Sequence, residues 1–313
     1  MDSTDDRLLG GLYGLLVGDA VGVPYEFHSP ARLPAWDAIE ITPPAGFRRA
    51  HARAPKCAWS DDGAQALCLL DSLLHCRALD LDDLGQRFLR WRDDGYLAVD
   101  GVVFDIGVQT SEALAALRAG APAHQSGPTE ERRNGNGSLM RVLPLALWHS
   151  GDDAALVRDA ALQSRVTHGH PRSQLCCALY CLWARATLRE SADPWRTATT
   201  TLRALCADNP TWSRELEEQI CPDSDPGGSG SGYVVDCLHS ARLALLEGSY
   251  ERVIKRAISL GNDTDTTAAV AGGIAGLRAG LSGIPSRWLD TLNGRELVDP
   301  LASSLRAQAL ARG

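Results

Sequence analysis

The residues best suited to chemistry lie in two short acidic clusters at opposite ends of the sequence. The first is Trp59-Ser60-Asp61-Asp62-Gly63, and the second is Gly261-Asn262-Asp263-Thr264-Asp265-Thr266-Thr267. Together they offer carboxylate and hydroxyl oxygens, with no Cys or His inside either cluster. Oxygen ligands suit hard cations such as Mg²⁺, Mn²⁺ or Ca²⁺ and not Zn²⁺. If the clusters meet in the fold, they would hold a pair of metal ions that supports hydrolysis.

Each cluster also fits a simpler interpretation, in which its polar residues start a helix. Ser60 is a favourable N-cap residue, and acidic residues in the following turn interact favourably with the helix dipole. Thr264 or Asp265 could cap a helix that begins near Thr266 in the same way. Two caps alone do not call for Asp-Asp in one cluster and Asp-Thr-Asp in the other.

The composition is that of an ordinary globular protein. The chain has 313 residues, of which 44% are hydrophobic and 22% are charged, so a sizeable core is available. The formal net charge of -8 argues against a general nucleic-acid surface. No uninterrupted apolar run reaches membrane-span length, and the acidic N-terminus does not resemble a secretory signal.

The nine cysteines indicate a reducing compartment. Their number is odd, no Cys-x-x-Cys spacing occurs, and Cys176, Cys177 and Cys181 lie together on an apolar helical run. This pattern is typical of buried free thiols and not of a disulfide framework or a zinc site. We therefore expect a cytoplasmic protein, and we expect it to act as a monomer.

Helical spacing of apolar residues dominates the chain. Such stripes follow the first acidic cluster and recur through residues 103–117, 156–166 and 175–186. Further helices are expected over 233–247, closed by Gly248, and over 252–260. Only residues 38–42 hint at a strand. The sequence predicts an all-α fold, with a compact multi-helix core in a single domain over residues 1–313.

Two other features bear on how the site is assembled. Gly11, Gly14, Gly18 and Gly22 lie mostly four apart in the N-terminal helix, and because glycine destabilises a helix, close backbone packing must compensate. The stretch 222–232 is rich in Gly, Ser and Pro. We interpret it as a mobile loop beside the site and not as a linker between domains.

Further segments contain side chains suited to binding or catalysis. The run Gly135-Asn136-Gly137-Ser138-Leu139-Met140-Arg141 is either an ordinary turn or a cradle whose N–H groups hold a phosphate. His168, in Thr167-His168-Gly169-His170-Pro171, is either structural or hydrogen-bonded to a phosphate or ribose. Asp105 is expected by default to cap a helix. Glu26, at the exit of the first helix, would by itself be a solvated surface residue.

In this order the segments resemble the ADP-ribosylglycohydrolases, a family that includes the dinitrogenase reductase-activating glycohydrolase and the ADP-ribosyl-acceptor hydrolases. Each motif alone is weak, but the ordered set is specific and covers nearly the whole chain. The matching segments are Gly18-Asp19-Ala20-Val21-Gly22-Val23-Pro24-Tyr25-Glu26, Trp59-Ser60-Asp61-Asp62, Asp105-Ile106-Gly107, Gly135-Asn136-Gly137-Ser138-Leu139-Met140-Arg141, Thr167-His168-Gly169-His170-Pro171, Gly232-Tyr233-Val234-Val235-Asp236 and Leu260-Gly261-Asn262-Asp263-Thr264-Asp265-Thr266.

The resemblance implies a largely helical single domain with a two-metal centre of Mg²⁺ or Mn²⁺. The implied metal ligands are Ser60, Asp61, Asp62, Asp263, Asp265 and Thr266. The implied neighbours of ADP-ribose are Gly135, Asn136, Gly137, Ser138 and His168, with Tyr233 near the adenosine end. Glu26 would lie on a loop covering the cleft, and Asp105 would approach the ribose of the scissile bond.

The implied activity is hydrolysis of the bond between ADP-ribose and a modified acceptor, with a protein arginine side chain favoured. The metals would orient a water and lower its pKa. Asp61 or Asp62 would accept the proton of that water, and both are counted with Glu26 and Asp105 as catalytic candidates. The alternatives are a silent ADP-ribose-binding module, a structural use of the fold, and a hydrolase of a non-protein ADP-ribosyl conjugate.

The sequence departs from the family at three positions near the implied metals. Ser60 stands where Thr is common and keeps the hydroxyl, whereas Gly63 stands where Thr is common and loses it. Asn262 replaces a usual Gly. No carboxylate is lost, so we expect a functional site, and the change at Gly63 leaves the shape of the first metal shell open.

Overall fold

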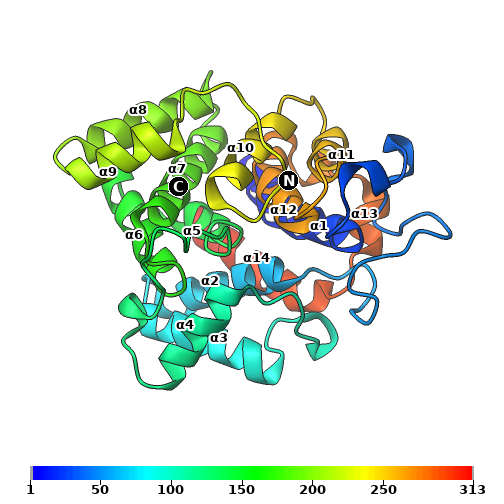
Figure 1. The fold of residues 1–313 in the computed structure, drawn as a ribbon, viewed down its shortest axis with the longest axis horizontal. Helices are drawn as coiled ribbons and strands as arrows, with labels where there is room; N and C mark the ends of the chain where they lie inside the picture. Colours follow the sequence, from blue (N-terminus) through cyan, green and yellow to red (C-terminus); the bar gives the residue numbers. More distant parts are fainter. Residues whose placement is uncertain (1–2, 312–313) are drawn as a thin grey trace.

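The computed structural model describes residues 3–311, and within that range it contains fourteen α-helices and no strand (Figure 1). The prediction of an all-α fold is confirmed. The helices are α1 (Ser3–Gly22), α2 (Asp61–Cys76), α3 (Leu81–Asp94), α4 (Val108–Arg118), α5 (Leu143–Trp148), α6 (Asp153–Arg165), α7 (Pro171–Leu188), α8 (Pro194–Cys206), α9 (Pro210–Arg214), α10 (Val234–Ala244), α11 (Tyr250–Ser259), α12 (Thr264–Ala279), α13 (Ser286–Thr291) and α14 (Arg295–Leu310). Short 3₁₀ helices cover Val23–Tyr25, Pro30–Arg32, Trp36–Ala38, Val99–Gly101, Ala123–Gln125 and Leu281–Gly283, and Glu215–Ile220 forms a π-helical turn.

Several predicted boundaries were wrong. The strand expected over 38–42 is absent, because a 3₁₀ turn ends at Ala38 and irregular backbone follows. The helix predicted to close at Gly248 ends earlier: α10 stops at Ala244, where Leu245 donates its N–H to Ala241 O at 3.0 Å. The second acidic cluster enters α12 at Thr264, two residues before the predicted start.

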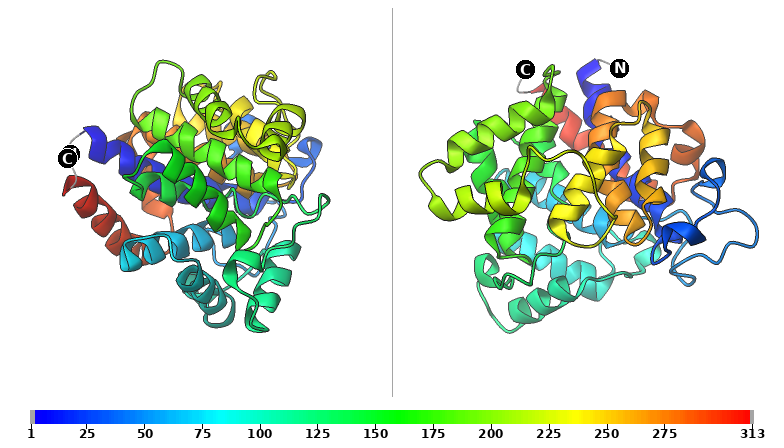
Figure 2. Two further views of the ribbon diagram at one scale, coloured as in Figure 1. Left: turned by 90° about the vertical axis from the view of Figure 1, so that its left-hand side faces the viewer. Right: turned by 45° about the horizontal axis from the view of Figure 1, so that its top comes forward.

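α1 and α12 lie side by side and form the tightest seam in the molecule (Figures 1 and 2). A Cβ atom on Gly14 would lie 2.5 Å from Gly272 O, and one on Gly18 would lie 2.2 Å from Ala268 O. Only glycine allows the two backbones to approach this closely. The close packing that the glycine spacing predicts is therefore present, and the partner is α12.

The same seam fixes the end of α1 against the start of α12. Thr264 donates its hydroxyl to Gly22 O at 2.8 Å, and a Cβ on Gly22 would lie 2.4 Å from the Cα of Asp265. The chain leaves α1 through the 3₁₀ turn Val23–Tyr25 and reaches Glu26 directly. Glu26 is thereby carried to the edge of the second acidic cluster.

The start of α2 is held to α1 by a buried carboxylate. Asp19 accepts the N–H of Ser60 at 2.9 Å and the N–H of Gly63 at 2.8 Å. These are two of the N–H groups that a helix start leaves unpaired, so Asp19 anchors the first cluster onto α1. α14 also returns to α1, where Arg306 donates to Asp5 at 2.6 Å, and the two ends of the described chain lie together (Figure 2).

α1 and α12 are also the most apolar of the long helices. The stretch Thr4–Tyr25 is long and apolar enough to cross a membrane by length and composition, but its apolar window is 100% buried inside the protein. That burial is what a core helix requires.

All nine cysteines are free thiols, and the three on α7, Cys176, Cys177 and Cys181, are buried as the sequence predicts.

Replacing Gly18 by alanine tests the α1–α12 seam. The added methyl group would meet the main-chain oxygen of Ala268, which cannot move aside as a flexible side chain would. We expect Gly18→Ala to lower the free energy of unfolding by at least about 1–3 kcal/mol, as overpacking does. Gly248→Ala is the matched control, because a Cβ there would meet nothing within 4 Å. Equal melting temperatures for the two variants would contradict the role of the seam.

Candidate metal centre and substrate cleft

The structure brings the two acidic clusters together at Asp62. Ser60 of the first cluster donates its hydroxyl to Asp62 Oδ2 at 3.2 Å. Thr266 of the second cluster donates its hydroxyl to the same oxygen at 3.3 Å. One carboxylate therefore joins the N-termini of α2 and α12, which lie far apart in the sequence.

Helix capping accounts for part of the first cluster and for none of the second. Ser60 caps α2 by accepting the N–H of Asp62 at 3.3 Å. At α12 the N-cap position is Asp263, whose side chain makes no capping hydrogen bond. Thr264 and Asp265 were the expected caps, but Thr264 bonds to Gly22 O and neither Asp265 oxygen has a hydrogen-bond partner within residues 3–311. The carboxylates of the second cluster need another explanation.

Two more carboxylates complete the acidic group. Glu26 is only 4% exposed, so its interpretation as a solvated surface residue is wrong. One oxygen each from Glu26, Asp263 and Asp265 lie within 4.8 Å of one another. Asp105 does not cap a helix, because α4 begins at Val108 after Gly107. Its backbone has a φ of +58°, and its carboxylate lies 3.8 Å from His51 Nε2 beside Glu26.

Gly63 and Asn262, the two larger departures from the family, have local structural reasons. A Cβ on Gly63 would lie 2.6 Å from the Cβ of buried Trp59, so no threonine fits while that indole is in place. Asn262 has a φ of +62°, in the left-handed region that glycine and asparagine tolerate best. Its N–H donates to His28 O at 2.8 Å, and its carbonyl accepts from Phe27 at 2.7 Å.

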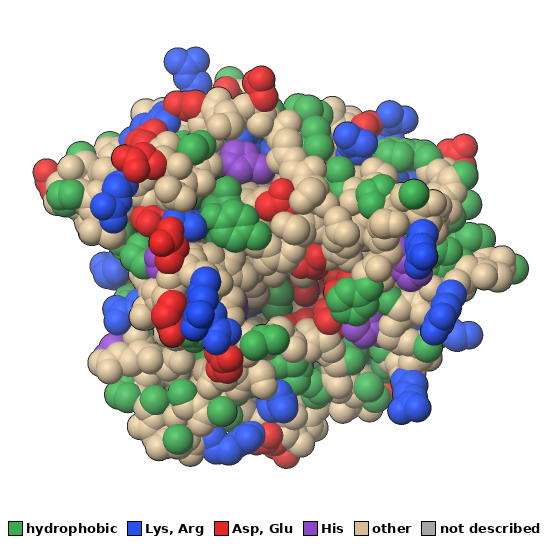
Figure 3. Space-filling view, viewed as in Figure 1, with side chains coloured by type: hydrophobic (Ala, Val, Ile, Leu, Met, Phe, Trp, Pro, Cys, Tyr) green, Lys and Arg blue, Asp and Glu red, His purple; other side chains and the backbone are tan. Residues whose placement is uncertain are grey.

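The acidic group lies in a cleft of about 250 Å³. Figure 3 shows acidic side chains on the floor of a hollow, with hydrophobic and histidine side chains beside it. The lining residues are Glu26, Asp61, Asp105, Gly107, Val108, Gln109, Thr110, Gly135, Asn136, Gly137, Met140, His168, Gly232, Asp263 and Thr266. Gly232 comes from the loop 222–232, which therefore lies beside the site as expected.

The glycines of the 135–138 turn bring main chain up to the cleft. A Cβ on Gly135 would lie 2.7 Å from Gln109 Oε1, and one on Gly137 would lie 2.8 Å from His168 Cε1. Between them, Asn136 donates its side-chain amide to Asp263 Oδ2 at 2.9 Å. The turn is thus tied directly to the second acidic cluster.

Of the remaining residues predicted to bind substrate, only His168 lines the cleft. His168 lines the cleft and is buried, and burial, with Arg141 nearby, lowers the pKa of its imidazole to about 3, so the ring is neutral. Ser138 is fully buried in the core, where it accepts a hydrogen bond from Ser164 at 2.8 Å. Tyr233 stands half-exposed outside the lining, with its hydroxyl accepting from Arg172 at 3.1 Å.

Asp19 and His51 have structural positions at the site that their sequence context did not predict. Asp19 is fully buried and joins α1 to α2, and the signal was a carboxylate interrupting the apolar run of the first helix. His51 contacts the Glu26 carboxylate across 25 residues of sequence. No pattern in the irregular segment around His51 marks it, because the contact depends on how that segment folds back.

Burial and crowding raise the pKa of these carboxyl groups. The pKa values of Asp61, Asp62 and Asp265 stand well above the usual range, first because of burial and then because of neighbouring carboxylates. Burial raises the pKa of Asp19 and of Asp105 to about 7. These groups therefore resist ionising together unless a cation is supplied.

Within residues 3–311, no Lys or Arg forms an ion pair with any of these carboxylates. In the same part of the chain, one oxygen of Asp62 and both oxygens of Asp265 are buried without a hydrogen-bond partner. Unpaired buried carboxylate oxygens are costly, and divalent cations remove that cost by direct ligation. The residues present therefore fit a hard metal ion.

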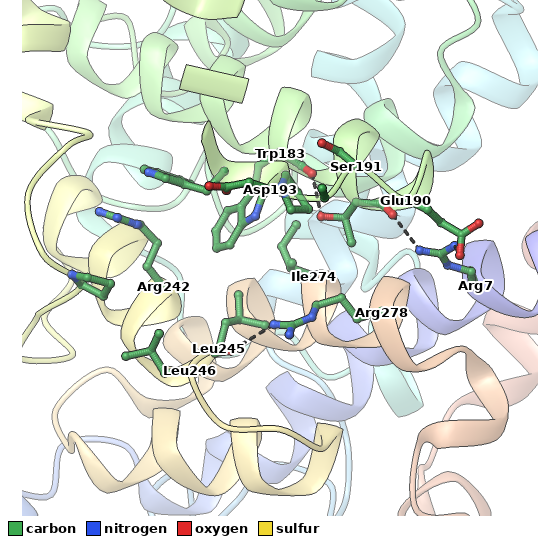
Figure 4. A pocket seen from close by; sticks show the side chains of 15 residues that line it. Arg7, Trp183, Glu190, Ser191, Asp193, Arg242, Leu245, Leu246, Ile274 and Arg278 are labelled. Carbon is green, nitrogen blue, oxygen red and sulfur yellow. Dashed lines mark hydrogen bonds and ion pairs between the residues drawn. The ribbon is translucent and has the colours of Figure 1, made fainter. Parts of the chain in front are cut away.

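A larger cavity of about 700 Å³ lies away from this cleft and contains none of its carboxylates (Figure 4). Its arginines are tethered to main-chain carbonyls: Arg7 bonds to Thr187 O at 2.7 Å and Arg278 bonds to Leu245 O at 3.0 Å. Size alone would favour this cavity as a binding site. The chemistry favours the smaller acidic cleft.

Comparison with known proteins agrees with the geometry. The profile of the family described as ADP-ribosylglycohydrolase matches residues 1–312. The chain is 31% identical to an ADP-ribosylarginine hydrolase, Tri1, of Pseudomonas putida (strain GB-1), over 96% of this chain and 78% of that protein. It is 27% identical to the ADP-ribosyl-[dinitrogen reductase] glycohydrolase of Rhodospirillum rubrum, over 93% of this chain and 92% of that protein.

A solved structure described as an ADP-ribosylglycohydrolase-related protein complex superimposes with a TM-score of 0.78 at 31% identity, covering 98% of this chain and 99% of that chain. The protein therefore belongs to the ADP-ribosylglycohydrolase family, and it is a glycohydrolase. The resemblance seen in the ordered motifs is confirmed.

Metal binding should show in thermal stability. With EDTA, Asp265→Asn should melt at a higher temperature than the wild type, because at neutral pH the wild type must keep this buried, unpartnered carboxyl group protonated far above its ordinary pKa, and an asparagine carries no such cost. Excess Mg²⁺ or Mn²⁺ should stabilise the wild type by about 2.7 kcal/mol at a hundredfold excess over the dissociation constant and should leave Asp265→Asn nearly unchanged. Asp152→Asn, at the exposed cap of α6, is the control. A wild type whose melting temperature changes neither with EDTA nor with added metal would contradict the metal site.

The metal-free protein should lose stability as the pH rises. Asp19 and Asp105 have folded-state pKa values of about 7, above the roughly 3.9 of an unfolded Asp. Between these values the folded state binds more protons than the unfolded state, so the free energy of unfolding falls with increasing pH. We expect the melting temperature in EDTA to fall between pH 5 and pH 8. A rise over that range would show that the carboxylates are already compensated.

Proposed function

We propose that this protein is a divalent-metal-dependent hydrolase that releases ADP-ribose from ADP-ribosylated arginine side chains of proteins. The observation that carries the proposal is the meeting of the two carboxylate clusters at buried Asp62, next to a cleft that residues of both clusters line together with a glycine turn. The similarity to a relative named for ADP-ribosylarginine supports the linkage.

Six residues would hold a pair of Mg²⁺ or Mn²⁺ ions: Ser60, Asp61, Asp62, Asp263, Asp265 and Thr266. When bound, such ions supply Lewis acidity toward a water and toward ribose hydroxyls. They would also neutralise carboxylates that otherwise repel one another. The unpaired oxygens of Asp62 and Asp265 support their assignment as ligands.

ADP-ribose would lie along the Gly135–Gly137 turn. Side chains are absent at Gly135 and Gly137, so main-chain groups can approach a diphosphate closely. The neutral ring of His168 would hydrogen-bond to the ligand from the same wall. Tyr233 would stand near the adenosine end, and Ser138 would contribute through its main chain because its side chain faces the core.

Asp61 or Asp62 would accept the proton of the attacking water. Asp61 is oriented for this role, because Gln65 donates its amide to Asp61 Oδ2 at 3.1 Å and accepts from Arg141 at 2.9 Å. Asp105 would lie against the ribose, whose developing positive charge carboxylates stabilise. Glu26 would cover the cleft and exclude water. The carboxylates at the mouth also complement the cationic guanidinium of an arginine acceptor.

We further propose that residues 1–313 act as a single domain and that the protein is a cytoplasmic monomer without a membrane or nucleic-acid partner. The extent of the family match and the joining of the two clusters support one domain. The nine free thiols support a reducing compartment, and the net charge of -8 argues against nucleic acid.

The direct test measures ADP-ribose released from an ADP-ribosylarginine protein. With Mg²⁺ or Mn²⁺, Asp62→Asn should lower turnover on the order of a hundred- to a thousandfold, because a group that stabilises charge at the reacting centre is lost. Asp152→Asn should keep normal turnover, since its carboxylate only caps an exposed helix. Serine-linked and base-linked substrates run in parallel identify the linkage. Normal release by Asp62→Asn, or no release from any substrate by the wild type, would overturn the proposal.

A further inference from the structure

We propose that His51 is a positioning residue that holds the Glu26 carboxylate over the acidic cleft. This inference rests on the proposed function, since it assigns a reason for the placement of the residue that covers the cleft. His51 is not one of the residues that the sequence motifs single out.

A single ring nitrogen of His51, Nε2, makes both contacts with the acidic residues. Nε2 of His51 is hydrogen-bonded to Glu26 Oε2 and lies 3.8 Å from Asp105 Oδ1. The Glu26 side chain is 5% exposed and that of His51 is 14% exposed, so water competes little for this contact. One nitrogen of the imidazole therefore faces two carboxyl groups that line the cleft.

Packing and main-chain contacts hold the ring in this position. His51 lies between two aromatic rings, with centroid distances of 5.4 Å to Phe27 and 5.1 Å to Phe104. One residue earlier, Ala50 donates its N–H to Pro24 O at 2.9 Å, which ties the His51 segment to the segment carrying Glu26. The backbone of His51 has a φ of +45°, an uncommon conformation for a residue other than glycine.

Glu26 needs such a partner because its other close neighbours are carboxylates. Oxygens of Asp263 and Asp265 lie within 4.8 Å of a Glu26 oxygen, and an oxygen of Asp105 also lies within that distance of a Glu26 oxygen. Crowding of carboxyl groups at these distances disfavours an ionised Glu26 in this buried position. The hydrogen bond with His51 gives the Glu26 carboxyl group a partner that is not acidic, so losing it should let the Glu26 side chain swing away while the Gly135–Gly137 wall stays in place.

The expected consequence is a loss of turnover without a loss of ligand binding. A misplacement of about 1 Å at a reacting centre commonly costs on the order of a hundredfold in rate. We expect His51→Ala to lower kcat by about ten- to a hundredfold and to leave the affinity for free ADP-ribose within about twofold. His51→Gln places an amide near the position of Nε2 and should recover most of the turnover.

A double-mutant cycle tests whether His51 acts through Glu26. If it does, adding His51→Ala to Glu26→Ala should cost nothing beyond the single Glu26→Ala change. His124→Ala, at an exposed histidine in the turn Ala123–Gln125, is the matched control and should keep wild-type turnover. Thermal melts of each variant and calorimetric ADP-ribose affinities accompany the kinetics.

Three results in turnover and ADP-ribose binding would overturn the inference while leaving the proposed function intact. They are normal turnover in His51→Ala beside an active wild type, an additive loss in the double mutant, and a fall in ADP-ribose affinity equal to the fall in turnover. His51, Glu26 and Asp105 also have the ligand types of a metal site. A fall in calorimetric Mn²⁺ or Zn²⁺ affinity in His51→Ala would show that His51 is a ligand and would equally overturn the positioning role. An inactive wild type would instead contradict the proposed function.

Discussion

The structure depends on one costly arrangement, a group of carboxylates buried side by side with no Lys or Arg of the described chain paired to them. Asp62 and Asp265 keep oxygens with no hydrogen-bond partner among residues 3–311, and burial raises the pKa of both. Such a group is tolerated only where the surrounding fold is rigid and its members are neutralised, either by protons or by a cation. The fold therefore has to hold together a site that its own electrostatics oppose.

The α1–α12 seam meets that requirement. Glycines at positions such as Gly14 and Gly18 let the two backbones touch, so the end of α1 and the start of α12 share one fixed geometry. Asp19 then fastens α2 to α1 through two main-chain N–H groups. Three helix ends are thereby set relative to one another by backbone packing and by buried side chains bonded to main-chain groups. Glu26 and Asp265 gain their positions from this frame.

The sequence is sufficient for the fold class, the family and the main acidic residues, because helical periodicity and local motifs are properties of short segments. The boundaries of α10 and α12 were misplaced, since tertiary contacts such as Thr264 with Gly22 O decide where those helices begin and end. Asp105 was misassigned as a cap because α4 begins only at Val108, with Gly107 at its N-cap position. His51 was missed because its contact joins an irregular segment to Glu26, and no spacing encodes such a contact. The glycine at position 63 looked like a lost hydroxyl, whereas the structure shows a packing need of Trp59.

The central claim is that the two clusters form one metal centre, and locating the ions tests it most directly. Crystals grown with Mn²⁺ and ADP-ribose would be measured for anomalous scattering. If the two clusters form one centre, two anomalous peaks should lie between the Asp61–Asp62 and Asp263–Asp265 segments, facing the Gly135–Gly137 wall. A map with no peak there, or with density only beside His51 and Asp105, would contradict it.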